Sequence, residues 1–557
     1  MRRTSGITIA ALALALSASG CTSLRDFVHN GFKVGPNYER PPAPLAPAWI
    51  DAANPRVKSA PADYSAWWSA FGDPVLDDLI RIAYQQNVNL RVAGTRVLEA
   101  RAQRAIAVGT LFPQQQTATG TYQHTQVSRN IANVPPSHFF DTWATNLNAS
   151  WEIDFWGRFR RTIESADDVV DASVDNYDFV MVSLIGDLAT AYVQYRIFEQ
   201  QLVYAHENVR LQQGSLEIAT ARWKAGQISE LGVSQATSLL EQFESTIPVI
   251  EIAVRQANNQ ICVLLGIPPA ELAARLGKAP IPQTPPEVVV GIPADLIRRR
   301  PDLRAAERSI AAQNAQIGVA EADWYPAFFI SGTIGYQAMD LGKLFASRSF
   351  TGQFGPSFQW NILNYGRILN NVRLQDFKTQ ELVATYQQDV LSAAQEVENG
   401  IISYLNARIE AEHLALSVQA AQRTVSIANA NFKAGTIDYT PVFVAEQFLA
   451  QQQNIFAQAE GDIALGLIAI YRALGGGWEL RLSEQAAGGG CFPGALPPSS
   501  QGPVAGKEVV DGTSDVSKVT ETAQEAHGDA DSLAASSSGH AHSSDSVATA
   551  NKKDRIP

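Results

Sequence analysis

Few residues of this 557-residue chain have types and spacings suited to catalysis or metal binding. Glu152 and Asp154 could act as paired carboxylates in acid–base chemistry; alternatively, they are solvated charges. His540 and His542, in the stretch GHAH, could bind a metal weakly, or they are incidental residues of a polar tail. The sequence lacks the patterns G-x-S-x-G, H-E-x-x-H, G-x-G-x-x-G and the P-loop. It therefore predicts a protein that is not an enzyme and that holds no metal or diffusible cofactor.

One of the three cysteines has a specific context. Cys21, Cys262 and Cys491 are too far apart for a disulfide framework or a zinc site. Near the N-terminus, two arginines precede an apolar run of about ten residues, half the roughly 20 that span a bilayer, and then SASGC, which ends at Cys21. This resembles a bacterial lipoprotein signal, in which Cys21 carries a covalent lipid; the alternative is a plain signal peptide with an incidental cysteine. We expect a signal peptide at 1–20 and a lipidated, extended segment at 21–66.

Composition limits the classes of protein to consider. The hydrophobic content of 46% is typical of a chain that buries a core, and 557 residues exceed one ordinary single-core domain. The net charge is −12, with scattered Lys and Arg rather than a basic patch, so no nucleic-acid partner is expected. Residues 484–557 are mostly Gly, Pro, Ser, Ala and Asp, which predicts a disordered low-complexity tail.

The chain repeats itself at a fixed distance. The similar stretches ARWKAGQIS and ANFKAGTID contain Gly226 and Gly435, and we call the difference between these positions the repeat offset (435 − 226 = 209). The same offset relates a WGR motif to a YGR motif, whereas Pro113 and Pro326, before the predicted hairpins, differ by slightly more (326 − 113 = 213). We interpret this as a tandem duplication, with about four extra residues in the first hairpin. Each repeat, 67–290 and 291–483, is a helix, a β-hairpin, a long helix, a tight turn and a return helix. Asp73 and Asp302 are the expected N-caps of the helices that begin after them.

The hairpins are predicted at 114–153 and 326–362. From 142 to 153, apolar residues such as Trp143 and Leu147 alternate with polar ones, which indicates a strand with one apolar face. Aromatic residues gather near the ends of the apolar faces, as in outer-membrane barrels; the alternative is the core of a soluble sandwich. Four strands cannot close a barrel, so several chains must share one, and three chains would supply twelve strands.

A very long helix follows each hairpin. Between 158 and 224, apolar residues are spaced alternately by three and four, which is a coiled-coil seam. At 1.5 Å per residue this helix would be roughly 100 Å long. The turns that reverse the chain are predicted at 225–230 and 434–439, and the fold class is mainly α with a small β part.

Together these motifs make the sequence similar to the outer membrane factor family, the TolC-like proteins, in the NodT-type lipoprotein branch. The resemblance covers roughly residues 34–478. Besides the two KAG turns, the motifs that carry it are VGPNYERPPAP at 34–44, WWSAFGDPVLDDLI at 67–80, DFWGR at 154–158 and RRPDLRAAE at 299–307.

The resemblance implies a homotrimer, with a 12-stranded β-barrel in the outer membrane continued by a periplasmic α-helical barrel. It implies a passive conduit that exports drugs or other small toxic compounds, with no cofactor except the lipid on Cys21. The partners would be outer-membrane lipid, a periplasmic adaptor (membrane fusion) protein and an inner-membrane pump of the RND type. The alternative cargo is protein, through a type I secretion system; an enzyme and a purely structural coiled-coil lipoprotein are further alternatives.

The resemblance also assigns site residues. The two turns match positions that meet the adaptor, and the other interpretation is that their glycines only end helices; these turn residues are Ala225, Gly226, Gln227, Ala434, Gly435 and Thr436. The family narrows its periplasmic aperture with acidic residues, but the matching positions here are Pro441 and Val444. The candidate aperture residues are therefore Asp438, Tyr439, Phe443, Val444 and Glu230, with Glu446 further along. Asp438 could instead be the N-cap of the return helix.

Overall fold

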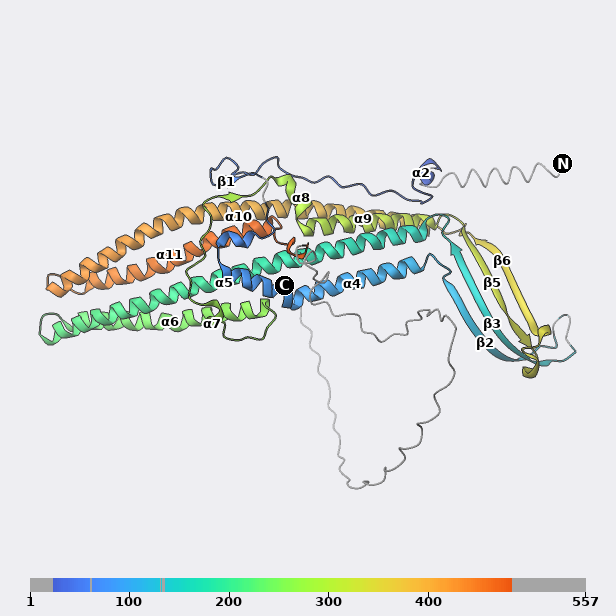
Figure 1. Ribbon diagram of the computed structural model, residues 1–557, viewed down its shortest axis with the longest axis horizontal. Helices are drawn as coiled ribbons and strands as arrows, with labels where there is room; N and C mark the ends of the chain where they lie inside the picture. Colours follow the sequence, from blue (N-terminus) through green and yellow to red (C-terminus); the bar gives the residue numbers. More distant parts are fainter. Residues whose placement is uncertain (1–23, 61–62, 131, 133–135, 483–557) are drawn as a thin grey trace, which may run out of the picture. The chain divides into compact units, whose positions relative to one another are not determined.

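A computed structural model describes residues 24–60, 63–130, 132 and 136–482 (Figure 1). The signal peptide, Cys21 and the tail with its two histidines lie outside these residues. The main elements are α3 (Pro74–Gln86), α4 (Val88–Gly109), β2 (Gln115–Gln126), β3 (Phe139–Ile153), α5 (Arg158–Lys224), α6 (Glu230–Leu264), α9 (Pro301–Ala322), β5 (Ala327–Ala338), β6 (Phe350–Gln359), α10 (Arg367–Ala434) and α11 (Thr440–Ala473). Shorter elements are α2 (Leu24–His29), β1 (Val57–Lys58), η1 (Trp67–Phe71), α7 (Ala273–Leu276), β4 (Val288–Val289), η2 (Pro293–Asp295), α8 (Leu296–Arg299), η3 (Leu341–Lys343) and η4 (Ser347–Ser349).

The duplication inferred from the sequence is present in the backbone. Helices α4 and α9 both have 22 residues, and their first residues, Val88 and Pro301, differ by the same larger offset as Pro113 and Pro326. After the hairpins the smaller repeat offset applies: α5 and α10 have 67 and 68 residues, and each begins after a glycine with φ 82°. The predicted long helix at 158–224 is therefore confirmed, and so is the longer first hairpin.

Equivalent polar side chains hold the helix junctions of the two repeats. Asn87 interrupts the first helix, accepts a hydrogen bond from the Leu90 N–H, and donates to the carbonyl of Leu264 at 2.8 Å. In the second repeat, Arg300 donates to the carbonyl of Ala473 at 2.9 Å. Leu264 and Ala473 are related by the repeat offset, and each lies in the last turn of a return helix, where carbonyls lack helical partners. At both junctions a polar side chain thus satisfies the last carbonyl of a return helix, through Asn87 in the first repeat and Arg300 in the second.

The N-cap predicted for the helix at this junction is wrong. Asp302 was expected to cap the helix that follows, but α9 begins at Pro301 and its N-cap is Arg300. Asp302 instead pairs with the guanidinium of Arg300 at 2.6 Å. The predicted cap at Asp73 is confirmed, because its carboxylate accepts hydrogen bonds from the Val75 and Leu76 N–H groups.

The two hairpins form one antiparallel sheet in the order β2-β3-β5-β6. The register places Leu147 opposite Ile334, Trp151 opposite Ile330, and Phe328 opposite Phe358. Directly paired residues point to the same side, so the apolar faces of both hairpins merge into one continuous face. No other layer of the described chain covers this face, and Phe354 and Phe358 are 78% and 69% exposed. The described residues therefore build no sandwich core on this face.

The long helices make two antiparallel pairs, α5 with α6 and α10 with α11, and α5 also packs against α11 (Figure 1). The seam predicted on α5 is buried, including Tyr177, Met181 and Leu188. Burial of this seam supplies the hydrophobic stabilisation that a single long helix lacks in water. Within the described residues, no helix combines the length and the apolarity needed to cross a bilayer.

The start of α5 is fixed by charged side chains. The carboxylate of Asp154 accepts hydrogen bonds from the backbone N–H groups of Phe159 and Arg160, both at 3.0 Å, and from Arg160 Nε at 2.9 Å. It therefore satisfies orphan donors at the N-terminus of α5. Glu152 lies 3.6 Å from Arg158. The interpretation of this pair as solvated charges is wrong for Asp154, whose side chain is only 7% exposed.

The same helix start holds the N-terminal segment. The fully buried guanidinium of Arg161 donates to the carbonyls of Val34 and Gly35 at 3.1 and 3.0 Å. Arg160 donates to the carbonyls of Gly31 and Phe32 at 2.7 and 2.8 Å. The segment that follows α2 is thereby fixed where the sheet meets the helices.

Two glycines of this region allow a matched test of backbone strain. Gly157 has φ 82°, and a Cβ there would lie 2.8 Å from Lys33 Cα, so Gly157→Ala should destabilise the protein by about 2 kcal/mol or more. Gly214 lies inside α5 with open space around its Cβ position, so Gly214→Ala should stabilise it by up to about 1 kcal/mol. Thermal unfolding followed by circular dichroism measures both effects. Equal midpoints for the two variants would contradict the role of Gly157.

Candidate functional site: the paired hairpin tips

The first tip is the turn between α5 and α6. Gly226 has φ 68°, a left-handed conformation that favours glycine. Its N–H donates to the Trp223 carbonyl at 2.8 Å, and the Gln227 N–H donates to the Arg222 carbonyl at 2.9 Å, which closes the last turn of the helix. Ala225, Gly226 and Gln227 are all exposed.

The second tip repeats this geometry between α10 and α11. Gly435 has φ 79° and donates to the carbonyl of Phe432 at 3.1 Å. Thr436 donates twice to the carbonyl of Asn431, from its N–H and from its hydroxyl, both at 3.0 Å. Ala434, Gly435 and Thr436 are exposed. The glycines therefore end helices in both tips, as one interpretation held, and the exposed turns remain available for contact with another molecule.

An arginine joins the two tips. Arg222, in the last turn of α5, donates from Nη1 to the carbonyl of Phe432 at 2.6 Å. Its guanidinium also lies 4.8 Å from the centre of the buried Phe432 ring, within the range of a cation–π interaction. A positive charge at the C-terminus of α10 is favoured by the helix dipole. Arg222 thus binds the first tip to the second within one chain.

A polar layer behind the tips joins three helices. Gln212 of α5 donates from Nε2 to the Ala236 carbonyl of α6 and to the Tyr439 hydroxyl, both at 2.7 Å. The Tyr439 ring also meets the Phe432 ring edge-on at 5.5 Å. Tyr439 is only 2% exposed, and burial raises the pKa of its hydroxyl. The prediction that Tyr439 lines an aperture is wrong, because its side chain is enclosed between helices of its own chain.

Glu446 belongs to the same layer. It is 1% exposed, and its Oε1 accepts hydrogen bonds from the Ser215 hydroxyl of α5 at 2.7 Å and from Asn429 of α10 at 3.0 Å. Burial raises the pKa of this carboxyl, and the two hydrogen bonds partly offset the rise. Further along the seam, Asn208 donates to Gln453 at 3.0 Å.

The other predicted aperture residues have different surroundings. Asp438, Glu230 and Val444 are exposed, and Phe443 is half-buried against the hydrophobic cluster of the tips. Asp438 is not the helix cap, because the N-cap of α11 is Tyr439. The aperture role stays a prediction for Asp438, Glu230, Val444 and Phe443.

The spacing of the α5 seam also marks the polar layer in the sequence. The three-and-four spacing of the α5 seam continues through Asn208, Gln212, Ser215 and Ala219, all of them buried. Polar residues at seam positions of a coiled coil face the partner helix rather than solvent. This spacing identifies Gln212 and Ser215 as interhelical contacts, and Arg222 lies at the next position of the same pattern.

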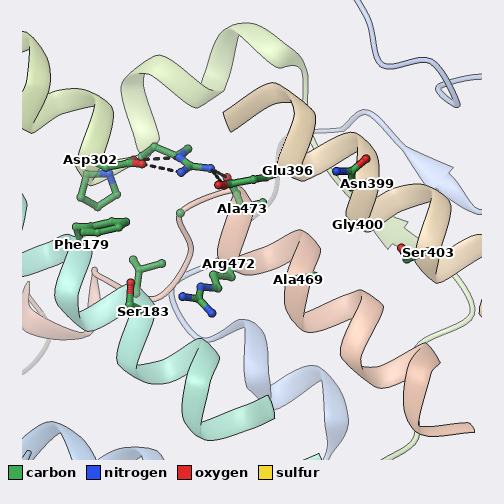
Figure 2. A pocket seen from close by; sticks show the side chains of 14 residues that line it. Phe179, Ser183, Asp302, Glu396, Asn399, Gly400, Ser403, Ala469, Arg472 and Ala473 are labelled. Atoms are coloured by element: carbon green, nitrogen blue, oxygen red, sulfur yellow. Dashed lines mark hydrogen bonds and ion pairs between the residues drawn. The ribbon is translucent and has the colours of Figure 1, made fainter. Parts of the chain in front are cut away.

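A cavity of about 500 Å³ lies away from the tips, where the start of α9 meets the end of α11 between α5 and α10 (Figure 2). Asp302 and Glu396 both bind the Arg300 guanidinium, each with a contact of 2.6 Å. Arg472, also on its wall, pairs with Asp187 at 2.7 Å. The charged side chains of the cavity are thus engaged in ion pairs that hold the junction together.

Comparison with known proteins agrees with this architecture. The model of the family described as "Outer membrane efflux protein" matches residues 79–267 and 292–476, one match for each repeat. The gap between the two matches contains α7 and β4, which lie between the repeats.

Individual relatives cover most of the chain. "Nodulation protein T" of Rhizobium leguminosarum bv. trifolii is 28% identical over 81% of this chain and 95% of its own length. The "Pyoverdine export outer membrane protein OpmQ" of Pseudomonas putida is 29% identical over 74% of this chain and 88% of its own. The solved structure of the outer-membrane channel OprN superposes with a TM-score of 0.75 at 31% identity, over 80% of this chain and 99% of that one. The chain belongs to the outer membrane efflux protein family and is an outer-membrane efflux channel that extends into the periplasm.

Proposed function

We propose that three copies of this chain form the passive outer-membrane conduit of a tripartite efflux system for drugs or other small toxic compounds. Cys21 carries a lipid, and the tips dock with a periplasmic adaptor that connects the channel to an inner-membrane pump of the RND type. The observation that carries the proposal is the exposed apolar face of an incomplete four-stranded sheet, placed at the start of two very long helices.

The sheet supports sharing between copies. Among the described residues, β2 and β6 each pair on one side only, so two edges with free backbone donors and acceptors remain. Lipid cannot satisfy these groups, whereas the β6 edge of one copy and the β2 edge of the next can satisfy each other. Three copies then give twelve strands with one apolar outer face.

The helices support the same arrangement. Exposed apolar side chains continue along α10 at intervals of two or three helical turns: Leu391, Ile402, Ile409, Leu416 and Ile427. Leu391 and Ile402 correspond, at the repeat offset, to Val182 and Val193 of α5, which are buried inside the chain. The face that is covered on α5 within the chain is therefore open on α10 and is suited to a second copy.

Helix α6 carries the complementary open face. Ile252 and Val263 are about 60% exposed, and they correspond at the same offset to Gly461 and Arg472 of α11. Those two residues pack against α5, where Gly461 touches Ile197. The α6 face of one copy therefore meets the α10 face of the next, just as α11 meets α5 within the chain.

The N-terminal segment supports the lipid. Phe27 of α2 packs against Phe155 and Trp156, where β3 ends and α5 begins, with ring centres 6.4 and 5.5 Å apart. Leu24, the first residue of α2, follows closely after Cys21 in the sequence. The described chain therefore begins, shortly after Cys21 in the sequence, with a helix packed at the end of the apolar sheet face.

Removal of the gene from its host tests the function. Deletion should raise accumulation of a fluorescent efflux dye, and wild-type protein should restore the low level. The Cys21→Ala variant should not incorporate a palmitate label, whereas the control Cys491→Ala should. Dye efflux by the Cys21→Ala variant shows whether the lipid is needed for transport. Unchanged accumulation across several dyes would contradict small-molecule efflux and direct attention to secreted proteins.

A charge on the open α10 face should block assembly. Ile409→Glu buries a carboxylate between copies, at a cost of several kcal/mol that a helix contact cannot absorb. We expect monomers in size-exclusion chromatography with light scattering, whereas Gln419→Glu, the same charge at an exposed polar position of α10, should remain trimeric. A trimeric Ile409→Glu would refute this interface.

The hydrogen bond from Arg222 to the Phe432 carbonyl should protect the backbone of the second tip from amide exchange. Arg222→Ala removes a charge-assisted hydrogen bond, typically about 1.5–3 kcal/mol, so amide exchange at 431–440 should rise about 10- to 100-fold. Lys224→Ala removes a neighbouring exposed charge and should leave the exchange unchanged. Hydrogen exchange with mass spectrometry of both variants measures the effect, and equal protection would show that the tips are held together by other contacts.

A further inference from the structure

Glu446 is the acidic side chain of the tip region that has least access to water. It lies two turns after the start of α11, at 1% exposure, whereas Asp438 and Glu230 are exposed. Its Oε1 accepts two hydrogen bonds, but its Oε2 is buried and has no hydrogen-bond partner among the described residues. A carboxylate left in this position would be desolvated on one side.

The groups that face Glu446 do not compensate a negative charge. Ser215 of α5 and Asn429 of α10 donate hydrogen bonds to Glu446, and Tyr439, the N-cap of α11, lies near enough to interact with it electrostatically. Of these only Tyr439 titrates, and burial raises its pKa, so it is neutral at physiological pH. Helix α6 takes part through the Ala236 carbonyl, which is bound by Gln212. No cation belongs to this set of described contacts.

We propose that Glu446 is a proton-dependent latch between α11 and α5, holding the tips together when protonated and favouring their separation when ionised. The proposal rests on the proposed function, since it concerns the periplasmic end of the conduit. Protonation removes the buried charge and with it the larger part of the desolvation cost. Ionisation instead favours any movement of α11 that brings the carboxylate into water.

The direction of the pH effect follows from the raised pKa in the packed state. A group whose pKa is higher when packed stabilises packing fully below its unperturbed pKa, and that contribution is lost as pH rises through the raised value. The packed tips are therefore most stable at acidic pH. With one such group per chain, the equilibrium between packed and separated tips changes by at most about tenfold per pH unit and chain.

The latch is present in only one of the two repeats. At the repeat offset, Glu446 corresponds to Thr237, an exposed and neutral residue of α6. Three copies would thus hold three latches, all at the α5–α11 contact within chains. A single substitution removes every one of them.

The test compares two conservative variants of the full-length trimer reconstituted in planar lipid bilayers. Wild-type conductance should rise several-fold between pH 5 and pH 8. Glu446→Gln, which mimics the protonated acid and keeps an acceptor for Ser215 and Asn429, should stay at the low value throughout. Glu230→Gln, at an exposed acid of the first tip, should keep the wild-type response. A pH response that survives in Glu446→Gln, or that disappears in Glu230→Gln instead, overturns the latch.

Hydrogen exchange on the same preparations separates the latch from the proposed function. Protection factors for residues 436–450 should fall from pH 5 to pH 8 in the wild type and stay constant in Glu446→Gln. If the wild type forms no pores at any pH, the channel proposal fails, while the protection factors still decide the latch. Constant protection in the wild type overturns it. Size-exclusion chromatography confirms that each variant is a trimer before it is measured.

Discussion

The fold depends on backbone hydrogen bonds that one chain cannot complete. A four-stranded sheet has two edges, and here its apolar face is left uncovered by the rest of the described chain. In water such a sheet would aggregate, and in lipid its edges would be unsatisfied. Closure with further copies removes both difficulties at once. The long helices must then follow the symmetry of the closed sheet, which explains why α10 and α6 present apolar faces that nothing in the described chain covers.

The internal duplication makes the ring that closes the sheet nearly regular. Because the repeats share one geometry, the proposed trimer gives the α5–α11 contact within a chain a counterpart between α10 of one copy and α6 of the next. The two offsets, one before and one after the hairpins, keep every helix end in register, including the carbonyls of Leu264 and Ala473. A change of length in one hairpin therefore leaves the helices undisturbed, since the sheet absorbs it in its outer loop.

Much of this could be predicted from the sequence because the signals were periodic. The seam gave the limits of α5, and strict alternation gave the strands and their apolar face. Failures occurred where a single polar side chain had two possible partners. Asp302 is a residue type that often caps helices, but it pairs with Arg300. Asp154 could have been a solvated charge, but it accepts hydrogen bonds from the start of α5. Tyr439 follows an exposed turn, yet its hydroxyl is bound by Gln212 of α5, a helix that belongs to the other repeat and is remote in the sequence.

Because each chain holds two repeats with different residues, the contacts between tips within one copy can differ from the contacts between copies. In a ring of identical single repeats all of these contacts would be the same. Phe432 is buried beneath Arg222, whereas its counterpart Trp223 is 43% exposed in the chain. The counterpart of Arg222 is Asn431, which carries no charge and cannot reproduce the cation–π contact or the charge-assisted bond to a helix carbonyl. The tips within one chain are therefore joined by a stronger polar contact than the one available between copies. A chain of this kind can keep a symmetric wall and still distinguish the contacts inside each copy from those between copies.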